Sequence, residues 1–202
     1  MRSFRRLDSF LEALQRDIYP EPVMEPHITI TKQTIDMMER DGMIHPGDHV
    51  LDIGCGQGLA LEIFAAKGLK VTGLTLGPDA QLCREKGFNI IKADQSFTAL
   101  TPQTFDLLWC RHVLEHSIAP FFTLSEYFRL IKSGGRAYIE VPAADTCCHH
   151  EKNPNHYSIM PKSSWLELMA RVGFVIERSG DINVQTDAGP DIYWAFHLRR
   201  LA

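Results

Sequence analysis

The chain has 202 residues, 45% of them hydrophobic, which is enough to fill the core of one domain. Its 21 basic residues are outnumbered by 25 acidic ones, so no broad positive surface for a phosphate backbone is expected and nucleic acid is not suggested as a substrate. Five cysteines without a spaced framework, and no apolar run near the roughly 18 residues of a membrane helix, indicate a reduced, cytoplasmic protein without a membrane span.

The N-terminal residues predict two helices ahead of the first strand. The first is amphipathic and breaks at residues 19–22, and its apolar positions recur at helical spacing: Phe4, Leu7, Leu11, Leu14 and Ile18. The second covers residues 28–41 and ends at Asp41-Gly42. We assign residues 1–44 to a helical extension. Its first helix either packs on the flank of the domain, which a single apolar stripe favours, or serves as a lid or a homodimer contact.

Strand and helix patterns alternate from residue 45 onward. Strands are expected near residues 48–53, 70–75, 89–92, 105–110 and 135–141, and helices near residues 57–67, 79–86, 119–132 and 162–172. Two further strands, near residues 174–182 and 191–198, predict an antiparallel hairpin. The order indicates an α/β fold with a doubly wound, mostly parallel sheet, a C-terminal antiparallel hairpin and helices on both faces. Residues 45–202 are then the cofactor-binding core of a single domain, 1–202.

A glycine-rich turn follows the first of these strands. Behind the apolar pair Val50-Leu51 comes the run Asp52-Ile53-Gly54-Cys55-Gly56-Gln57-Gly58. Glycine permits positive φ and removes the Cβ that keeps a ligand off the backbone, and the start of the next helix points free N–H groups at whatever binds there. Sheets of this kind bind ligands at the carboxyl ends of their strands. We therefore expect a small polar cofactor to be held by Asp52, Gly54, Cys55, Gly56 and Gly58.

Two cofactor classes use a turn of this kind. A nicotinamide dinucleotide site requires G-x-G-x-x-G and an acid about 20 residues later. Here the glycines alternate, residue 59 is Leu59, and Leu74-Thr75-Leu76 stands where the acid is expected. An oxidoreductase of the nicotinamide type is therefore disfavoured.

The turn and a series of later motifs resemble the class I S-adenosylmethionine-dependent methyltransferase superfamily. The acid followed by G-x-G-x-G matches the first motif of that superfamily without a gap. The similarity extends over about residues 45–180 through Val71-Thr72-Gly73-Leu74-Thr75, Lys92-Ala93-Asp94, Phe105-Asp106-Leu107-Leu108-Trp109, Leu114-Glu115-His116 and Leu130-Ile131-Lys132-Ser133-Gly134-Gly135. The resemblance implies a Rossmann-like fold, S-adenosylmethionine as the cofactor and a small-molecule methyl acceptor.

The resemblance also implies roles for residues after the second and third strands. Many relatives hold the ribose of the cofactor with an acid where this chain has Thr75, followed by Leu76, and a hydroxyl lacks the charge-assisted pair that a carboxylate makes. Thr75 is either a ribose contact or a strand-end threonine that faces a neighbour. Asp94 falls where relatives bind the adenine amino group, with Gln95 as a backbone contact, although turns and helix starts also use aspartate.

Residues 111–116 admit three interpretations. His112-Val113-Leu114-Glu115-His116 fits the H-x-x-E-H pattern of a zinc hydrolase, but that pattern needs a long helix, whereas this segment follows an apolar strand and is closed by Pro120. In the methyltransferase interpretation Arg111 binds the carboxylate of the cofactor, His116 is a second cofactor contact and His112 is a candidate catalytic base. In the third, both histidines only order the turn.

The longest irregular segment covers residues 142–160 and is expected beside the acceptor pocket. It contains Cys147-Cys148-His149-His150 and His156, but zinc ligands are spaced so that each turns inward, which four consecutive residues cannot all do. No metal is therefore predicted. His156 and Tyr157 are, with His112, candidate general bases. A solvated loop is the alternative.

The chemistry of a sulfonium donor sets the predicted mechanism. The methyl group already carries a leaving group, so the enzyme aligns an acceptor in line with it, excludes water and removes a proton where the acceptor has one. We predict a methyltransferase that acts on an oxygen or nitrogen atom of a small molecule. A non-catalytic binding protein that keeps the fold is the alternative.

Overall fold

The computed structural model describes residues 4–14 and 22–201, which form a seven-stranded sheet with the order β3-β2-β1-β4-β5-β7-β6. The strands are β1 (His49–Ile53), β2 (Lys70–Leu74), β3 (Asn89–Ile91), β4 (Phe105–Arg111), β5 (Ile131–Pro142), β6 (Phe174–Thr186) and β7 (Gly189–Arg200). Strands β1 to β5 pair in parallel, and β7 pairs antiparallel with both β5 and β6. The predicted α/β class, with its mostly parallel sheet and C-terminal hairpin, is confirmed.

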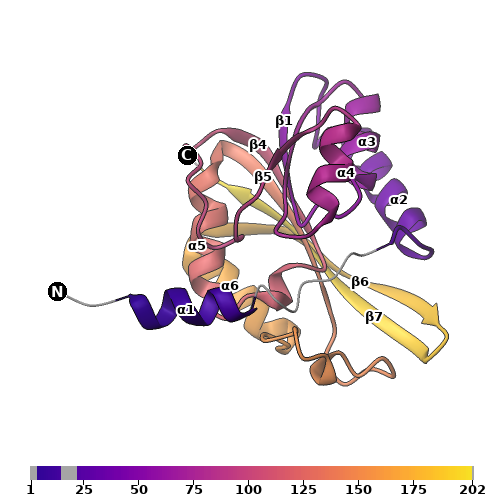
Figure 1. Cartoon of the computed structure of the whole chain (residues 1–202). Coiled ribbons are helices and arrows are strands. Elements are labelled where there is room, and N and C mark those ends of the chain that lie inside the picture. The colour runs from indigo at the N-terminus through magenta and orange to yellow at the C-terminus, as the bar shows by residue number, and fades with distance from the viewer. Residues whose placement is uncertain (1–3, 15–21, 202) are drawn as a thin grey trace.

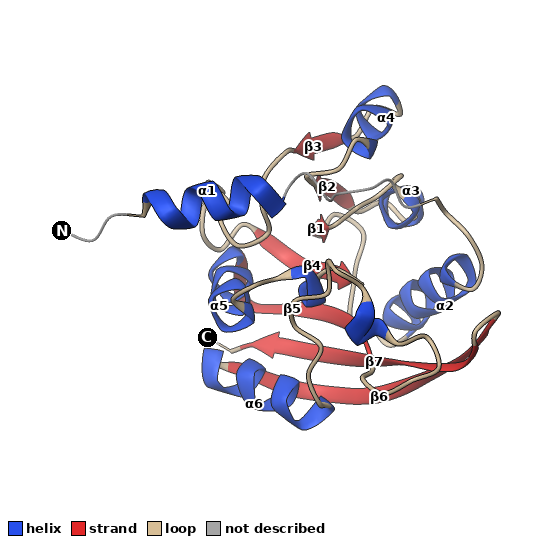
Figure 2. Cartoon of the chain, turned by 60° about the horizontal axis from the view of Figure 1, so that its bottom comes forward, coloured by secondary structure: helices blue, strands red, loops and turns tan. Residues whose placement is uncertain are grey.

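Helices cover both faces of this sheet (Figures 1 and 2). α2 (His27–Arg40) and α3 (Leu59–Ala66) lie on one face, α5 (Pro120–Leu130) and α6 (Lys162–Val172) lie on the other, and α4 (Asp79–Glu85) lies beside β3. Successive strand residues point to opposite faces. Leu108 therefore packs in the apolar cluster that includes α5 and α6, whereas its neighbours Leu107 and Trp109 pack in the cluster that includes α2 and α3.

The first helix, α1 (Arg5–Leu14), lies outside these layers (Figure 1). None of its residues is buried, and Phe4 just before it and Phe10 on it are both exposed. Leu11 and Leu14 instead line the cavity at the carboxyl edge of the sheet. α1 therefore contributes to the wall of this cavity. Ile18 of the predicted helix and residues 19–21 of its predicted break lie outside the described residues.

Several element boundaries differ from the prediction, and the hairpin strands are longer than expected, since β6 ends at Thr186 and β7 begins at Gly189. The helix expected from residue 57 begins at Leu59, because Gly58 takes a left-handed conformation with a φ of 90° at the helix start. The helix expected over residues 119–132 ends at Leu130, and β5 begins directly at Ile131 rather than near residue 135. Ile131 pairs with Phe105 before the β4–β5 register shifts, so the strand starts earlier than its apolar run suggests.

The five cysteines are all free thiols. Cys55, Cys83 and Cys110 are buried, whereas Cys147 is exposed and Cys148 is partly exposed. Among the described residues, no helix combines the length and the apolar character needed to cross a membrane.

Candidate functional site

The turn after β1 is tied to the end of β2. The backbone N–H groups of Gly54 and Cys55 both donate to the carbonyl of Leu74, at 2.7 and 3.3 Å. Gly54 has a φ of 70°, and a Cβ there would lie 2.1 Å from a methyl carbon of Val113. A Cβ at Gly56 would meet nothing within 4 Å. Gly54 is therefore required by packing, whereas Gly56 leaves open space along the backbone that a ligand can fill.

Asp52, near the end of β1, carries a buried carboxylate. Its Oδ2 has no hydrogen-bond partner among the described residues, and only 3% of the residue is exposed. Burial raises the pKa of Asp52 to about 8, and the positive charge of Arg111 opposes the rise. An unpaired carboxylate in such surroundings is costly unless a cationic or hydrogen-bonding group binds it. This orphaned oxygen points to a ligand.

A cavity opens at the carboxyl ends of β1 to β4, where the turn lies. Its wall is formed by the strand ends, the loop after β4, α1 and the loop of residues 142–160. The sequence-predicted site residues that line it are Gly54, Gly56, Thr75, Leu76, Asp94, Gln95, His112, His116 and Tyr157. Those that do not line it are Asp52, Cys55, Gly58, Arg111 and His156.

The side of the cavity near β2 and β3 carries four polar side chains. Thr75 Oγ1 accepts a hydrogen bond from the Gly77 backbone at 3.0 Å, and Asp94 Oδ1 accepts one from the Ser96 backbone at 2.7 Å. Gln95 donates to the carbonyl of Val113. In contrast, Asp79 in the first turn of α4 lines the cavity, and no described residue makes a hydrogen bond to its carboxylate. The cavity wall therefore carries two carboxylates, those of Asp79 and Asp94.

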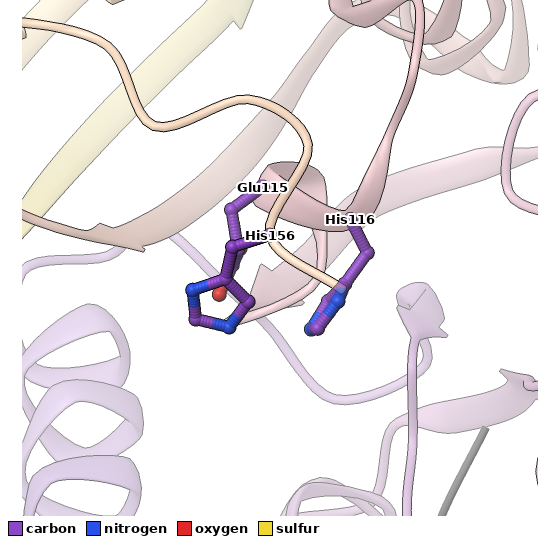
Figure 3. Close-up of side chains that lie close together, drawn as sticks. All are labelled: Glu115, His116 and His156. Atoms are coloured by element: carbon purple, nitrogen blue, oxygen red, sulfur yellow. The ribbon is translucent and has the colours of Figure 1, made fainter. Parts of the chain in front are cut away.

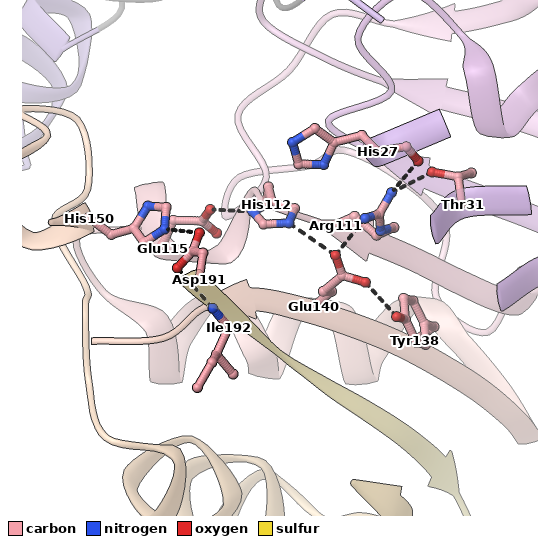
Figure 4. Close-up of polar contacts among 10 residues, drawn as sticks. All are labelled: His27, Thr31, Arg111, His112, Glu115, Tyr138, Glu140, His150, Asp191 and Ile192. Carbon is pink, nitrogen blue, oxygen red and sulfur yellow. Dashed lines mark hydrogen bonds and ion pairs between the residues drawn. The ribbon is translucent and has the colours of Figure 1, made fainter. Parts of the chain in front are cut away.

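His112 follows β4 and lies between two carboxylates (Figure 4). Its Nε2 is 3.0 Å from Oε1 of Glu140, and its Nδ1 is 3.8 Å from Oε1 of Glu115. Its φ of 53° is uncommon for a residue other than glycine, although histidine tolerates it better than most. The ring also packs edge-on against Tyr193, with ring centroids 4.3 Å apart. Such strained, tightly held residues cluster at functional sites.

Glu140, within β5, is the hub of this network (Figure 4). Its Oε1 accepts hydrogen bonds from His112 and, at 2.6 Å, from Nη2 of Arg111, while its Oε2 accepts one from the Tyr138 hydroxyl, also at 2.6 Å. Burial acts to raise the pKa of Glu140, but Arg111 and the hydrogen bonds outweigh it and hold the pKa below its usual range. Glu140 is therefore a fixed anion beside His112.

Glu115, His116 and His156 lie close together beside the cavity, which His116 lines (Figure 3). One ligand atom from each lies within 4.8 Å of the others, and the rings of His116 and His156 meet edge-on with centroids 4.9 Å apart. Nδ1 of His116 lies 2.9 Å from the carbonyl of Asn155. Burial and the neighbouring His116 and His150 lower the pKa of His156 to about 4, so its imidazole is neutral near pH 7.

A family model described as a methyltransferase domain matches residues 37–179. The chain belongs to the methyltransferase domain family. The ubiquinone biosynthesis O-methyltransferase of Pseudomonas fluorescens is 36% identical to the methyltransferase over 108 residues, which are 50% of this chain and 46% of that relative. The chain thus matches about half the length of this relative.

Solved structures share the fold of this methyltransferase at low sequence identity. A sarcosine dimethylglycine methyltransferase from Galdieria sulphuraria, so described provisionally, has a TM-score of 0.73 at 14% identity and covers 96% of this chain and 98% of its own. A phosphoethanolamine N-methyltransferase of Haemonchus contortus, crystallised with phosphomonomethylethanolamine and S-adenosylhomocysteine, has a TM-score of 0.69 at 16% identity. It covers 84% of this chain and 52% of its own. These neighbours establish the Rossmann-like architecture of the methyltransferase.

Three predicted cofactor contacts of the methyltransferase, Arg111, Cys55 and Gly58, do not line the cavity. Arg111 follows the alternation of β4, points toward α2 as Trp109 does, and donates to Glu140, to Thr31 Oγ1 and to the His27 carbonyl. Its guanidinium is therefore committed inside the protein rather than to a cofactor carboxylate. Cys55 is buried in an apolar cluster behind the turn, and Gly58 begins α3. Both shape the turn without facing the cavity.

The H-x-x-E-H interpretation lacks the helix that it requires. His112 directly follows β4, and His116 ends the short 3-10 turn η2 (Leu114–His116), so the two histidines are not on one helix face. Of the candidate bases, His112 and Tyr157 line the cavity, whereas His156 lies behind His116.

Several important residues were missed from the sequence. Asp79 lies four residues after Thr75, beyond the strand end where an acid is expected. Glu140 had a usable signal, since a single acid inside the apolar run Tyr138-Ile139-Glu140-Val141 implies a buried partner. No sequence signal marks Asp191, because its partner His150 is 41 residues away.

Proposed function

We propose that the chain is an S-adenosylmethionine-dependent methyltransferase that methylates a hydroxyl oxygen of a small molecule. The observation that carries this proposal is His112, which lines the same cavity as the glycine turn and is hydrogen-bonded to the buried Glu140. A protein that only binds the cofactor has no need of a histidine held by a carboxylate at that point. Relatives named ubiquinone biosynthesis O-methyltransferases support oxygen rather than nitrogen as the acceptor atom.

The residues at the cavity fit the proposed cofactor. Asp52 does not itself line the cavity, but it directly precedes the lining residues Ile53 and Gly54, and its orphaned Oδ2 suits the ammonium group of the methionine portion. The open backbone at Gly56 allows close approach. Thr75 and Asp79 together offer the ribose a hydroxyl and a carboxylate, which makes up for the missing acid at the end of β2. One oxygen of Asp94 remains for the adenine amino group, since the other caps the turn. When bound, S-adenosylmethionine supplies an electrophilic methyl group on a sulfonium centre.

His112 serves in this proposal as the general base. Its hydrogen bond to Glu140 assigns the proton of the neutral ring to Nε2, which leaves the lone pair on Nδ1 for the proton of the acceptor hydroxyl. Glu140 and Glu115 then flank the imidazolium that forms, at 3.0 and 3.8 Å. Glu140 orients His112 by this hydrogen bond. Many enzymes hold a histidine base with a carboxylate in the same way.

The apolar part of the wall excludes water and selects the acceptor. Leu11 and Leu14 of α1, with Ile118 and Tyr157, cover the acceptor side of the cavity. An acceptor that combines an apolar body with a hydroxyl fits these surfaces best. We also propose α1 as a lid over this side. A homodimer through the outward face of α1 remains a prediction that the elution volume of the purified chain on size exclusion will test.

Calorimetry with S-adenosylhomocysteine tests the cofactor half of the proposal. We expect binding by the intact chain, at least tenfold weaker binding by Asp52→Asn and unchanged binding by Asp187→Asn, an exposed aspartate on the hairpin turn. Incubation with methyl-labelled cofactor and a metabolite extract tests the catalytic half. Label should appear in small molecules with the intact chain and not with His112→Asn.

The two assays separate the alternatives. Absence of S-adenosylhomocysteine binding overturns the proposed function entirely. Binding without transfer to any component of the extract supports a non-catalytic binding protein, and label confined to macromolecules redirects the acceptor class.

A further inference from the structure

Three potential metal ligands meet away from the cavity, where the loop of residues 142–160 crosses the C-terminal hairpin. Sγ of Cys148, a ring nitrogen of His150 and a carboxylate oxygen of Asp191 all lie within 4.8 Å of one another. Figure 4 shows His150, in the short turn η3 (His150–Lys152), directed at Asp191 at the start of β7. Nε2 of His150 is 2.9 Å from Oδ2 of Asp191.

The surroundings of these side chains orient their ligand atoms. The Asp191 side chain is only 1% exposed and the His150 side chain 17%. Oδ1 of Asp191 accepts a hydrogen bond from the Ile192 backbone at 2.9 Å, which leaves Oδ2 turned toward His150. Sγ of Cys148 lies 3.2 Å from Thr186 Oγ1 on β6. Carboxylate ligands of metals are themselves usually held by hydrogen bonds in this manner.

We propose that Cys148, His150 and Asp191 form a zinc site that fastens the loop of residues 142–160 to the β6–β7 hairpin. Thiolate, imidazole and carboxylate are together a donor set that Zn²⁺ accepts, whereas a thiolate disfavours Mg²⁺ and Ca²⁺. Zinc bonds of about 2.0 to 2.3 Å place tetrahedral ligand atoms roughly 3.3 to 3.8 Å apart, so small side-chain movements close the site. The sequence argument against four consecutive ligands still holds, because only two of the four residues take part and the third comes from β7.

Zinc binding releases protons from the ligand side chains. Cys148 gives up its thiol proton to solvent, and the proton shared by His150 and Asp191 leaves so that nitrogen and oxygen both face zinc. A fourth position remains for water. The metal then stabilises the loop, whose His156 ring stacks on His150 with centroids 5.7 Å apart and whose Tyr157 lines the cavity. The zinc site is structural and takes no part in methyl transfer.

The cluster of Glu115, His116 and His156 is the natural competitor for the same metal. Of its three members only His116 lines the cavity already described, and the cluster contains no sulfur. This difference allows a direct discrimination, because only a site with Cys148 gives Co²⁺ a thiolate-to-metal charge-transfer band.

The test uses the full chain without a polyhistidine tag, loaded with Zn²⁺ or Co²⁺ and dialysed. We expect about one metal per chain, a thiolate band with Co²⁺, and at least a tenfold loss of affinity in Cys148→Ser and His150→Asn. The adjacent, exposed Cys147 and His149 provide matched controls, and Cys147→Ser and His149→Asn should retain both the metal and the band. Circular dichroism checks that each variant folds.

A second measurement needs no variant. Zn²⁺ should slow alkylation of Cys148 at least tenfold while the reaction of Cys147 is unchanged, as mass spectrometry of the derived peptides will show. No bound metal above background overturns the proposal. So does a metal that leaves the Cys148 alkylation rate unchanged, or one that is lost in His156→Asn but kept in Cys148→Ser.

Discussion

Replacing His112 by asparagine tests the proposed base. Asparagine is chosen because residue 112 has a φ of 53°, a region that asparagine tolerates, so the backbone need not change. The change removes the ring nitrogen that faces the acceptor and the hydrogen bond to Oε1 of Glu140. Glu140 keeps its contacts with Arg111 and Tyr138, so no buried charge is left without a partner.

The expected loss follows from the role assigned to His112. General base catalysis contributes about 10²- to 10⁴-fold, or roughly 2.7 to 5.4 kcal/mol of barrier. We therefore expect kcat with a phenolic acceptor to fall by this factor at pH 7. Binding of S-adenosylhomocysteine should remain within about twofold, because the donor side of the cavity lies at β2 and β3.

The pH dependence is the decisive readout. A phenol has a pKa of about 10, so roughly 10⁻³ of it is ionised at pH 7 and about 10⁻¹ at pH 9. Without a base, His112→Asn can use only the ionised acceptor, so its rate should rise about a hundredfold over this interval, and far more steeply than that of the intact enzyme. His45→Asn, at an exposed histidine in the turn before β1, is the matched control and should match the intact enzyme throughout. A deficit in His112→Asn that stays constant from pH 7 to pH 9 refutes the role of His112 as base.

Three further changes test the surrounding network. Glu140→Gln leaves the buried Arg111 guanidinium without its carboxylate and should lower the free energy of unfolding in urea by about 3 to 5 kcal/mol, whereas Glu177→Gln at a more exposed pair should cost under about 1 kcal/mol. The native pKa of Asp52 is about 8 and its ordinary value 3.8, so the folded state binds more protons and loses stability as the pH rises from about 4 to 8. Asp52→Asn should flatten that part of the thermal stability profile, and an unaltered profile contradicts the burial of this charge. Asp79→Asn should weaken S-adenosylhomocysteine binding about tenfold in calorimetry, and unchanged affinity removes Asp79 from the ribose site.

The fold was predictable because its signals are local. The glycine turn, the alternation of strands and helices and the C-terminal hairpin each depend on neighbours in sequence, and all of these predictions agree with the structure. The early start of β5 was missed because pairing between Ile131 and Phe105, rather than any apolar pattern, extends that strand. Tertiary pairing overrode local preference there.

The partners of the charged side chains could not be predicted in the same manner. The position of Arg111 at the end of the fourth strand predicts a contact with the cofactor, yet strand alternation turns its side chain to the α2 side, where it donates to Glu140 and Thr31. Side chains two residues apart on a strand point to the same face, so the sequence alone implies that Arg111 points to the same face as Trp109. The sequence does not show that Glu140 is the partner of Arg111, because the two residues are 29 positions apart.

The reversed direction of β7 explains why the acceptor side depends on the hairpin. In a parallel sheet only carboxyl ends of strands reach the binding edge, but an antiparallel strand brings its beginning there. Tyr193 therefore pairs with Pro142 at the end of β5, and its ring packs on His112 while Asp191 meets His150. In the proposed site the donor side is built from β1 to β3, whereas the acceptor side is built from β4, β5, the start of β7 and the loop of residues 142–160. Substitutions at Tyr193 should consequently change the KM for the acceptor at constant affinity for S-adenosylhomocysteine, and an equal change in both would contradict this division of the site.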